Sequence, residues 1–165
     1  GIRDYLNKNI NIYHAEDNNA LLLGDSFELL KKIKPKSIDC IFADPPYFLS
    51  NGGISVHGGK QVLVNKGKWD EGFSFQQKHA FNRKWIHLCK KLLTDNGTIW
   101  ISGTMHNIYS VGYALEQEGF KIINNITWDS ILHQILLAVA LHIAQRPSSG
   151  PKRVIKTRSI YLTTN

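Results

Sequence analysis

The feature that most constrains the fold of this 165-residue chain is an alternation of strand-like and helix-like segments. Short apolar runs rich in Ile and Phe are typical of buried strands, whereas apolar residues spaced three and four positions apart are typical of helices with one buried face. The segments predict strands over 37–43, 98–102 and 120–128, and helices over 26–33, 74–93 and 108–117. This order indicates an α/β fold whose parallel sheet is covered by helices on both faces.

The remaining segments are less regular. Residues 1–18 are polar and predict a short strand or an arm, and residues 21–23 form a short apolar run. The stretch 48–68 holds five glycines without periodicity, which predicts a long surface loop. Four apolar residues share one face of the helix expected over 74–93. They are expected in the core: Phe81, Trp85, Leu88 and Leu92.

Composition is that of an ordinary globular protein, with 42% hydrophobic and 20% charged residues. Cys40 lies in an apolar run and Cys89 in an expected helix, so two buried thiols are favoured over a disulfide, as in a reducing cytoplasm. The N-terminus is too polar for a signal peptide, and the longest apolar run, 135–144, is too short to span a membrane. We therefore expect a cytoplasmic protein.

The net charge of +7 is typical of proteins with a nucleic-acid partner, but its distribution weakens that inference. All 13 acidic residues lie in 1–129 beside 15 Lys and Arg, so this part of the chain carries only +2. The other five basic residues lie within 146–165, where no acidic residue occurs. Basicity is therefore a property of the tail.

The tetrapeptide Asp44-Pro45-Pro46-Tyr47 directly follows the strand expected over 37–43. A structural reading is a proline turn in which Asp44 caps a neighbouring group and Tyr47 packs below it. Its position favours a functional reading, because ligands of open α/β sheets bind beyond the carboxyl ends of the strands.

The chemistry that suits this tetrapeptide is attack by an exocyclic base amine, whose lone pair is delocalised into the ring. A carboxylate and a carbonyl that accept its two hydrogens would localise the lone pair, and Asp44 and Pro45 can supply them. Two prolines fix φ and remove N–H donors, and Tyr47 offers a stacking face for a base flipped out of the helix. Catalysis would then depend on positioning and electrostatics, so no metal is expected.

Residues 10–128, with DPPY after a hydrophobic strand and the run KWDEGFSFQQKHAFNRKWIHLCKKLLTDNGTIWISGTMHNIYSVGY, resemble the beta-group amino DNA methyltransferases. The resemblance is greatest to enzymes that methylate adenine in GATC. It implies a Rossmann-like sheet in circularly permuted order, S-adenosylmethionine as cofactor and methylation of adenine N6. Asp in place of Ser before the prolines favours adenine over cytosine N4, which remains the alternative.

By the same resemblance, Asp25 and Ser26 would contact the adenine of the cofactor, with Asp44 and Pro45 near its methionine end. For Asp25 a helix cap is the alternative. The loop over 52–68 would approach DNA phosphates. A solvated loop is the alternative for its three lysines: Lys60, Lys66 and Lys68. His106 and Asn107 follow the strand over 98–102 at the same edge, where a polar turn explains them equally well.

The partners implied are double-stranded DNA, with single-stranded DNA as an alternative, and a second copy of the chain. A cognate restriction endonuclease would be a functional partner without physical contact. A third hypothesis, from another class, is a catalytically silent fragment that binds DNA through its basic tail.

The resemblance ends at Trp128, so we expect residues 1–128 to be the catalytic-motif part of an incomplete methyltransferase domain and 129–165 to be foreign to it. Codons exist for the tail that in a shifted frame encode T-H-S-T-E-T and F-N-Y segments like those of the family. A frameshifted translation is therefore expected, with weak cofactor affinity and marginal stability. The alternative is a genuine buried helix over 131–144.

Overall fold

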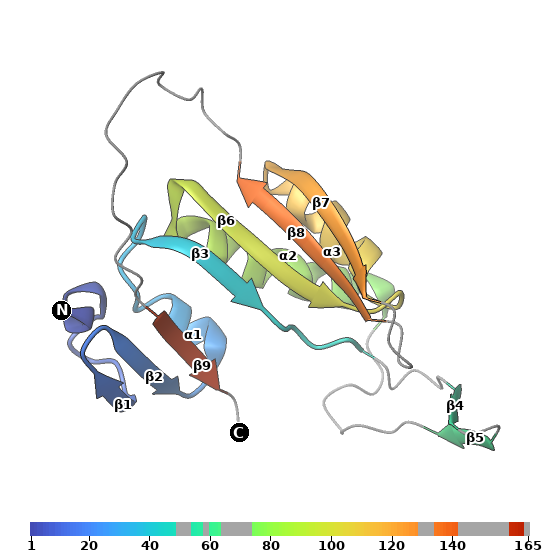
Figure 1. The fold of residues 1–165 in the computed structure, drawn as a ribbon, viewed down its shortest axis with the longest axis horizontal. Helices are drawn as coiled ribbons and strands as arrows, with labels where there is room; N and C mark the ends of the chain where they lie inside the picture. Colours follow the sequence, from blue (N-terminus) through green and yellow to red (C-terminus); the bar gives the residue numbers. More distant parts are fainter. Residues whose placement is uncertain (49–53, 58–59, 64–73, 129–133, 142–158, 164–165) are drawn as a thin grey trace.

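The computed structural model describes residues 1–48, 54–57, 60–63, 74–128, 134–141 and 159–163 (Figure 1). Within these residues it has three sheets, with strand orders β3-β6-β8-β7, β1-β2-β9 and β4-β5. The elements in chain order are η1 (Ile2–Tyr5), β1 (Ile12–Glu16), β2 (Asn19–Leu23), α1 (Ser26–Leu30), β3 (Ile38–Ala43), β4 (Ile54–His57), β5 (Lys60–Leu63), α2 (Phe75–Leu92), β6 (Leu93–Gly103), α3 (Ile108–Gln117), β7 (Phe120–Trp128), β8 (Gln134–Leu141) and β9 (Ser159–Thr163).

The central sheet is mixed. β3 pairs in parallel with β6, and Ala43 lies opposite Ile101 in the register. β8 lies between β6 and β7 and is antiparallel to both. The expectation of an all-parallel sheet is therefore wrong at β8, and so is the alternative of a helix over 131–144. A continuous apolar run does not by periodicity alone distinguish a strand flanked on both sides from a buried helix.

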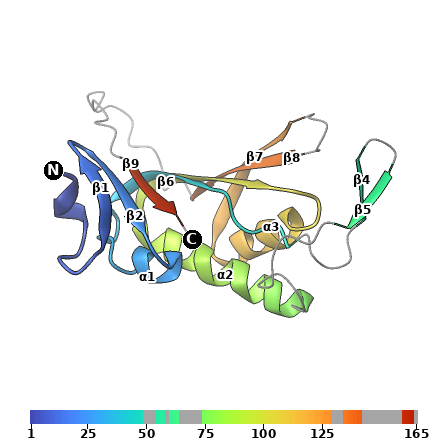
Figure 2. The same ribbon diagram turned by 90° about the horizontal axis from the view of Figure 1, so that it is seen from below.

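One face of the central sheet carries the helices. Figure 2 shows α2 and α3 on the same side of β3 and β6, and their apolar residues pack with Ile99 and Ile101 of β6 in one core cluster. On the other face of β3, Cys40 and Phe42 are exposed. Among the described residues, helical cover on both faces is not found, so the strand expected to be buried over 37–43 is half-buried on one face and exposed on the other.

The N-terminal segment forms a second, smaller sheet. β1 and β2 form an antiparallel pair, and β2 pairs in parallel with β9. Beneath it α1, shorter than the helix predicted over 26–33, contributes Leu29 to a second core cluster with Leu22 and Leu92. A short strand within 1–18 is thus confirmed as β1.

Local sequence signals account for the ends of the longer helices. Ser74 and Gln77 form a reciprocal capping box at the start of α2, with the two hydrogen bonds at 3.2 Å and 2.8 Å. After α3, Gly119 has φ +82°, a left-handed conformation that favours glycine. The predicted bounds of α3 and β7 are confirmed residue for residue, whereas β6 begins directly after α2 instead of at residue 98.

The four predicted core residues of α2 differ in burial. Trp85 and Leu92 are buried, while Phe81 and Leu88 are half-buried. Phe81 still packs against the main core and makes an edge-on contact with Phe27 at a ring-centroid distance of 5.3 Å. Asn82, absent from the prediction, is fully buried on the same helix.

The stretch predicted as a surface loop contains the hairpin β4-β5, so that prediction is wrong for 54–57 and 60–63. The sequence signal that indicates a hairpin is Gly58-Gly59 between two short runs with β-branched residues. The hairpin projects at the end of the molecule to which β3 and β6 point (Figures 1 and 2). No helix in the described part of the chain is long and apolar enough to cross a membrane.

The two cysteines differ in environment, and the expectation that both are buried is wrong for Cys40. Burial raises the pKa of Cys89 from 9.0 to about 12.

We expect one thiol to react with a thiol reagent at pH 8 in the native chain and two after denaturation, and Cys40→Ser to abolish the native reaction. Because an unfolded thiol ionises near pH 9, the stability contributed by neutral Cys89 should be lost as pH rises from about 9 toward 12.

Candidate functional site

The tetrapeptide Asp44–Tyr47 lies at the carboxyl end of β3, beside the carboxyl end of β6. The parallel pairing of the two strands brings these ends together, and Ser102 Oγ of β6 lies 3.4 Å from the Ala43 carbonyl oxygen. Ligands of open α/β sheets bind beyond the carboxyl ends of the strands, so a ligand is expected at this edge.

Asp44 is held by two hydroxyl groups. Tyr47 Oη and Ser102 Oγ each donate a hydrogen bond to Asp44 Oδ1, and the two hydroxyl oxygens lie 3.1 Å apart. Asp44 itself is exposed. Within the described residues no donor contacts its second oxygen, Oδ2, which therefore remains available to an incoming hydrogen-bond donor.

Tyr47 is half-buried and turned toward Asp44. Burial, followed by the hydrogen bond to Asp44, raises the pKa of Tyr47 above its ordinary value of 10.0. The hydroxyl is therefore a protonated donor at neutral pH, which is the form that stabilises the Asp44 carboxylate.

The other end of the tetrapeptide is anchored in the core. Asn107 Nδ2 donates to the Pro46 carbonyl oxygen at 3.0 Å. Phe48, which follows, is buried with φ +53°, a left-handed conformation that is costly for a bulky residue. Its ring meets that of Phe81 edge-on, with centroids 5.5 Å apart. Unusual backbone conformations persist where the surrounding packing holds them.

Asp25 and Ser26 lie at the start of α1, after β2 of the smaller sheet. Asp25 Oδ1 accepts a hydrogen bond from the Glu28 amide at 3.1 Å, so the helix cap expected as the alternative role is present. A cap uses one carboxylate oxygen, which leaves the second available to another hydrogen-bond donor.

The three lysines predicted near DNA are only partly described. Lys60 begins β5 of the projecting hairpin, while Lys66 and Lys68 lie outside the described residues. His106 and Asn107 follow β6 in the turn before α3.

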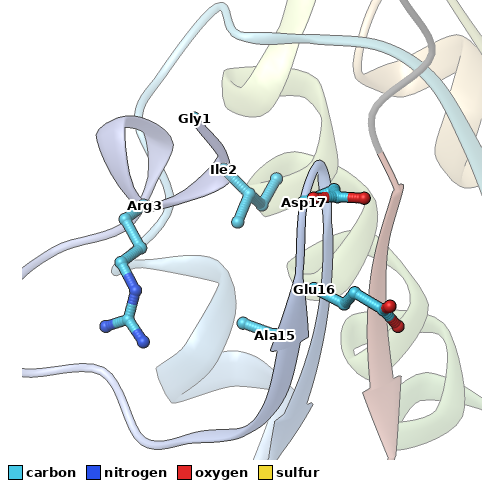
Figure 3. A pocket seen from close by; sticks show the side chains of 6 residues that line it. All are labelled: Gly1, Ile2, Arg3, Ala15, Glu16 and Asp17. Carbon is cyan, nitrogen blue, oxygen red and sulfur yellow. The ribbon is translucent and has the colours of Figure 1, made fainter.

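A hollow of about 330 Å³ lies at the N-terminal end of the molecule between η1 and the β1–β2 turn (Figure 3). It is lined by Gly1, Ile2, Arg3, Ala15, Glu16 and Asp17 and contains none of the predicted site residues. Among the described residues, no group of three or more His, Cys, Asp or Glu side chains could hold a metal ion.

The sequence analysis named Asp44 and Tyr47, which the structure brings together, but did not name Ser102 and Asn82. Ser102 carries a detectable signal, because it ends the strand expected beside the one that precedes Asp44. Asn82 carries none, since a polar residue within an amphipathic helix is ordinarily exposed.

Comparison with protein families matches residues 38–153 to a family described as DNA methylase. The type II methyltransferase M2.LlaDCHI of Lactococcus lactis subsp. cremoris is 65% identical over 116 residues, which cover 70% of this chain and 43% of the relative. M2.DpnII of Streptococcus pneumoniae is 64% identical over 116 residues, which again cover 70% of this chain and 43% of the relative. The chain thus spans about two fifths of the length of these curated relatives.

Solved structures share the fold at low sequence identity. The cytosine-N4-specific PvuII DNA methyltransferase aligns with a TM-score of 0.54 and 13% identity, over 95% of this chain and 61% of that one. TTHA0409 from Thermus thermophilus, complexed with S-adenosyl-L-methionine, aligns with a TM-score of 0.52 and 15% identity, over 78% and 56%. These similarities confirm the expected α/β methyltransferase fold.

Proposed function

Because this chain belongs to the DNA methylase family that its residues 38–153 match, we propose that its activity is methyl transfer from S-adenosylmethionine to adenine N6 in DNA. The observation that carries the proposal is the exposed Asp44 carboxylate at the carboxyl end of β3, fixed by two hydroxyl donors on one oxygen and open on the other. The resemblance of residues 10–128 to enzymes that methylate adenine in GATC supports an adenine in GATC as the target, and the type II methyltransferase name of M2.DpnII supports the methyl transfer.

The proposed roles follow from the chemistry of the amine. Asp44 Oδ2 and the Pro45 carbonyl accept its two hydrogens, which localises the lone pair on nitrogen. Tyr47 supplies a face for the flipped base. When bound, S-adenosylmethionine supplies an activated methyl group on its sulfonium. The amine nitrogen would take this methyl group, and its proton would pass to Asp44 and from there to solvent.

The residues present suit this cofactor. Asp25 offers a free carboxylate oxygen next to Ser26 at a helix start, and we assign the cofactor's adenine to this pair. Asp44 and Pro45 would lie at the methionine end, where a carboxylate stabilises the positive sulfonium. Lys60, Lys66 and Lys68 are assigned to DNA phosphates, and the position of the β4-β5 hairpin at the same end of the molecule supports Lys60.

The biological setting proposed is a cytoplasmic restriction–modification system acting on double-stranded DNA. The type II methyltransferase names of the relatives support this setting. A cognate endonuclease would share the recognition sequence without contacting this chain, and a homodimer is the proposed assembly.

The domain organisation proposed is a methyltransferase part over 1–128 and a tail over 129–165 translated in a shifted frame. The family match continues to residue 153, so the coding DNA provides the decisive test. A shifted frame that encodes T-H-S-T-E-T in this stretch is expected. A gene without such a frame would make the tail native.

The test of function is transfer of labelled methyl to GATC-containing duplex DNA, by this chain and by a frame-restored version, followed by nucleoside analysis. N6-methyladenine supports the proposal, and N4-methylcytosine replaces it with the alternative activity. If neither version transfers methyl and DNA binding is salt-sensitive and independent of sequence, the protein is a DNA-binding fragment.

Two substitutions at Tyr47 distinguish the role of its ring from the role of its hydroxyl. Tyr47→Ala should weaken methyl transfer by roughly 10–100-fold, because stacking of a base on an aromatic ring contributes about 1–3 kcal/mol. Tyr47→Phe keeps the stacking face and leaves Ser102 as a donor to Asp44, so it should lose less than about tenfold. The measurement is kcat/KM for GATC DNA, and equal losses in both variants would contradict a stacking role.

A further inference from the structure

A row of buried polar side chains connects α2 and α3 to the Pro46 carbonyl group. Asn82 is 0% exposed and Asn107 is 2% exposed. Asn82 Nδ2 donates to Asn107 Oδ1 at 2.9 Å, and Asn107 Nδ2 donates to the Pro46 oxygen at 3.0 Å. Buried amides are costly unless their hydrogen bonds are satisfied, so this row holds a defined geometry.

Trp85 determines which atom of each asparagine amide donates and which accepts. Its indole Nε1 can only donate, and it donates to Asn82 Oδ1 at 3.1 Å. Asn82 must therefore present its amide nitrogen to Asn107 Oδ1, and Asn107 must present its own nitrogen to Pro46. A flipped amide at either position would set donor against donor or acceptor against acceptor.

Asn107 makes this contact instead of capping its own helix. It is the N-cap of α3, where Asn ordinarily accepts a hydrogen bond from an amide of the first turn. Its side chain makes no capping bond and instead reaches a carbonyl 61 residues away in sequence. A departure from a local rule without local gain is typical of functional sites.

The contact has a direct consequence for the tetrapeptide. Both prolines have a fixed φ, so the orientation of their carbonyls depends on the remaining ψ angles. Ser102 holds Asp44 at one end, and Asn107 holds the Pro46 carbonyl at the other. The Pro45 carbonyl lies between these two held points.

We propose that Asn107 is a positioning residue, oriented by Asn82, that clamps the Pro46 carbonyl and thereby directs Asp44 and Pro45 at the base amine. This inference rests on the proposed function for its catalytic consequence, but not for the clamp itself. Ser110 completes the support, since it accepts from Asn82 Nδ2 at 3.0 Å and pairs with His79 Nδ1 at 2.9 Å.

The test uses Asn107→Ser on the full chain. Serine is a good N-cap, so α3 should keep its start, but the shorter side chain cannot reach Pro46 and removes one acceptor of Asn82 Nδ2. Because a buried donor without its acceptor costs about 1–3 kcal/mol, we expect a folded variant that melts roughly 2–12 °C lower. Asn107→Asp is the isosteric second variant, which can accept from Asn82 but cannot donate. Asn96→Ser is the matched control, because Asn96 is exposed near the start of β6, away from Ser102.

The first readout is independent of activity. NMR of chains labelled at proline and tyrosine reports the Pro46 carbonyl carbon and the Tyr47 ring. Both signals should move in Asn107→Ser and in Asn107→Asp, and neither should move in Asn96→Ser. Unchanged signals in folded Asn107 variants would overturn the clamp, whether or not the chain transfers methyl.

The second readout is methyl transfer to GATC DNA. Asn107→Ser should lower kcat about 10–100-fold, as expected for misplaced catalytic groups, with KM for DNA changed less than about threefold. An active parent chain with an equally active Asn107→Ser variant would overturn the positioning role and leave the proposed function intact. Absence of transfer by the parent chain itself would overturn the proposed function, and the NMR signals would still decide the clamp.

Discussion

If the proposed function is correct, replacement of Asp44 by Ala is expected to lower methyl transfer by about 10³-fold or more. By the proposed mechanism, the variant loses the acceptor for one amine hydrogen and the group that takes the proton. The first contribution is on the order of 10²–10³-fold and the second on the order of 10²–10⁴-fold. Asp44→Asn keeps an acceptor oxygen for the amine and should lose less. Single-turnover transfer to GATC DNA measures both.

Asp39→Ala is the control for this prediction. Asp39 is also an exposed aspartate of β3, but it lies near the amino end of the strand and accepts from Thr94 Oγ1 at 3.0 Å. The Asp39→Ala variant should transfer methyl at the same rate as the parent chain. Because Asp44 is exposed, thermal melting of Asp44→Ala should stay close to that of the parent. An Asp44→Ala variant that retained a tenth of the activity would exclude Asp44 as the amine acceptor.

Leu115→Ala is expected to destabilise the fold by about 2–5 kcal/mol, the range for loss of a fully buried leucine side chain. Leu115 is 0% exposed in the core between α3, α2 and β6. For a chain of this size the loss corresponds to a fall in melting temperature of roughly 5–15 °C. Thermal and urea denaturation followed by circular dichroism measure it.

Tyr109→Ala provides the matched comparison on the same helix. Tyr109 is 74% exposed, and its loss should change the free energy of unfolding by about 0.5 kcal/mol or less. If the two variants melted together, α3 would not pack on the sheet as described. Because α3 also carries Asn107 at its start, the packing of Leu115 supports the helix from which Pro46 is held.

The position of the candidate site at the end of β3 could be predicted from sequence because its signals are local. Asp44 follows an apolar strand directly, and the expected position at a strand end needs only the periodicity of 37–43. The bounds of α3 and β7 were also predictable, since Gly119 ends one and the other is a short run rich in Ile. These features depend on residues within a few positions of each other.

Several features were decided by tertiary structure, because they depend on strands and helices distant in sequence. Whether Cys40 is buried depends on which face of β3 the helices cover. The antiparallel direction of β8 depends on its insertion between β6 and β7. The apolar composition of a strand does not say which of its faces is covered or whether it pairs parallel or antiparallel.

By itself, the sequence determined which groups are available for the chemistry, and the tertiary structure decided how those groups are held. Asp44, Pro45 and Tyr47 could be named from their order along the chain. Ser102 reaches Asp44 across 58 residues, and Asn107 reaches Pro46 across 61. A hydrogen bond between such distant residues exists only after β3 has paired with β6 and α3 has packed against α2, because these contacts bring donor and acceptor within about 3 Å.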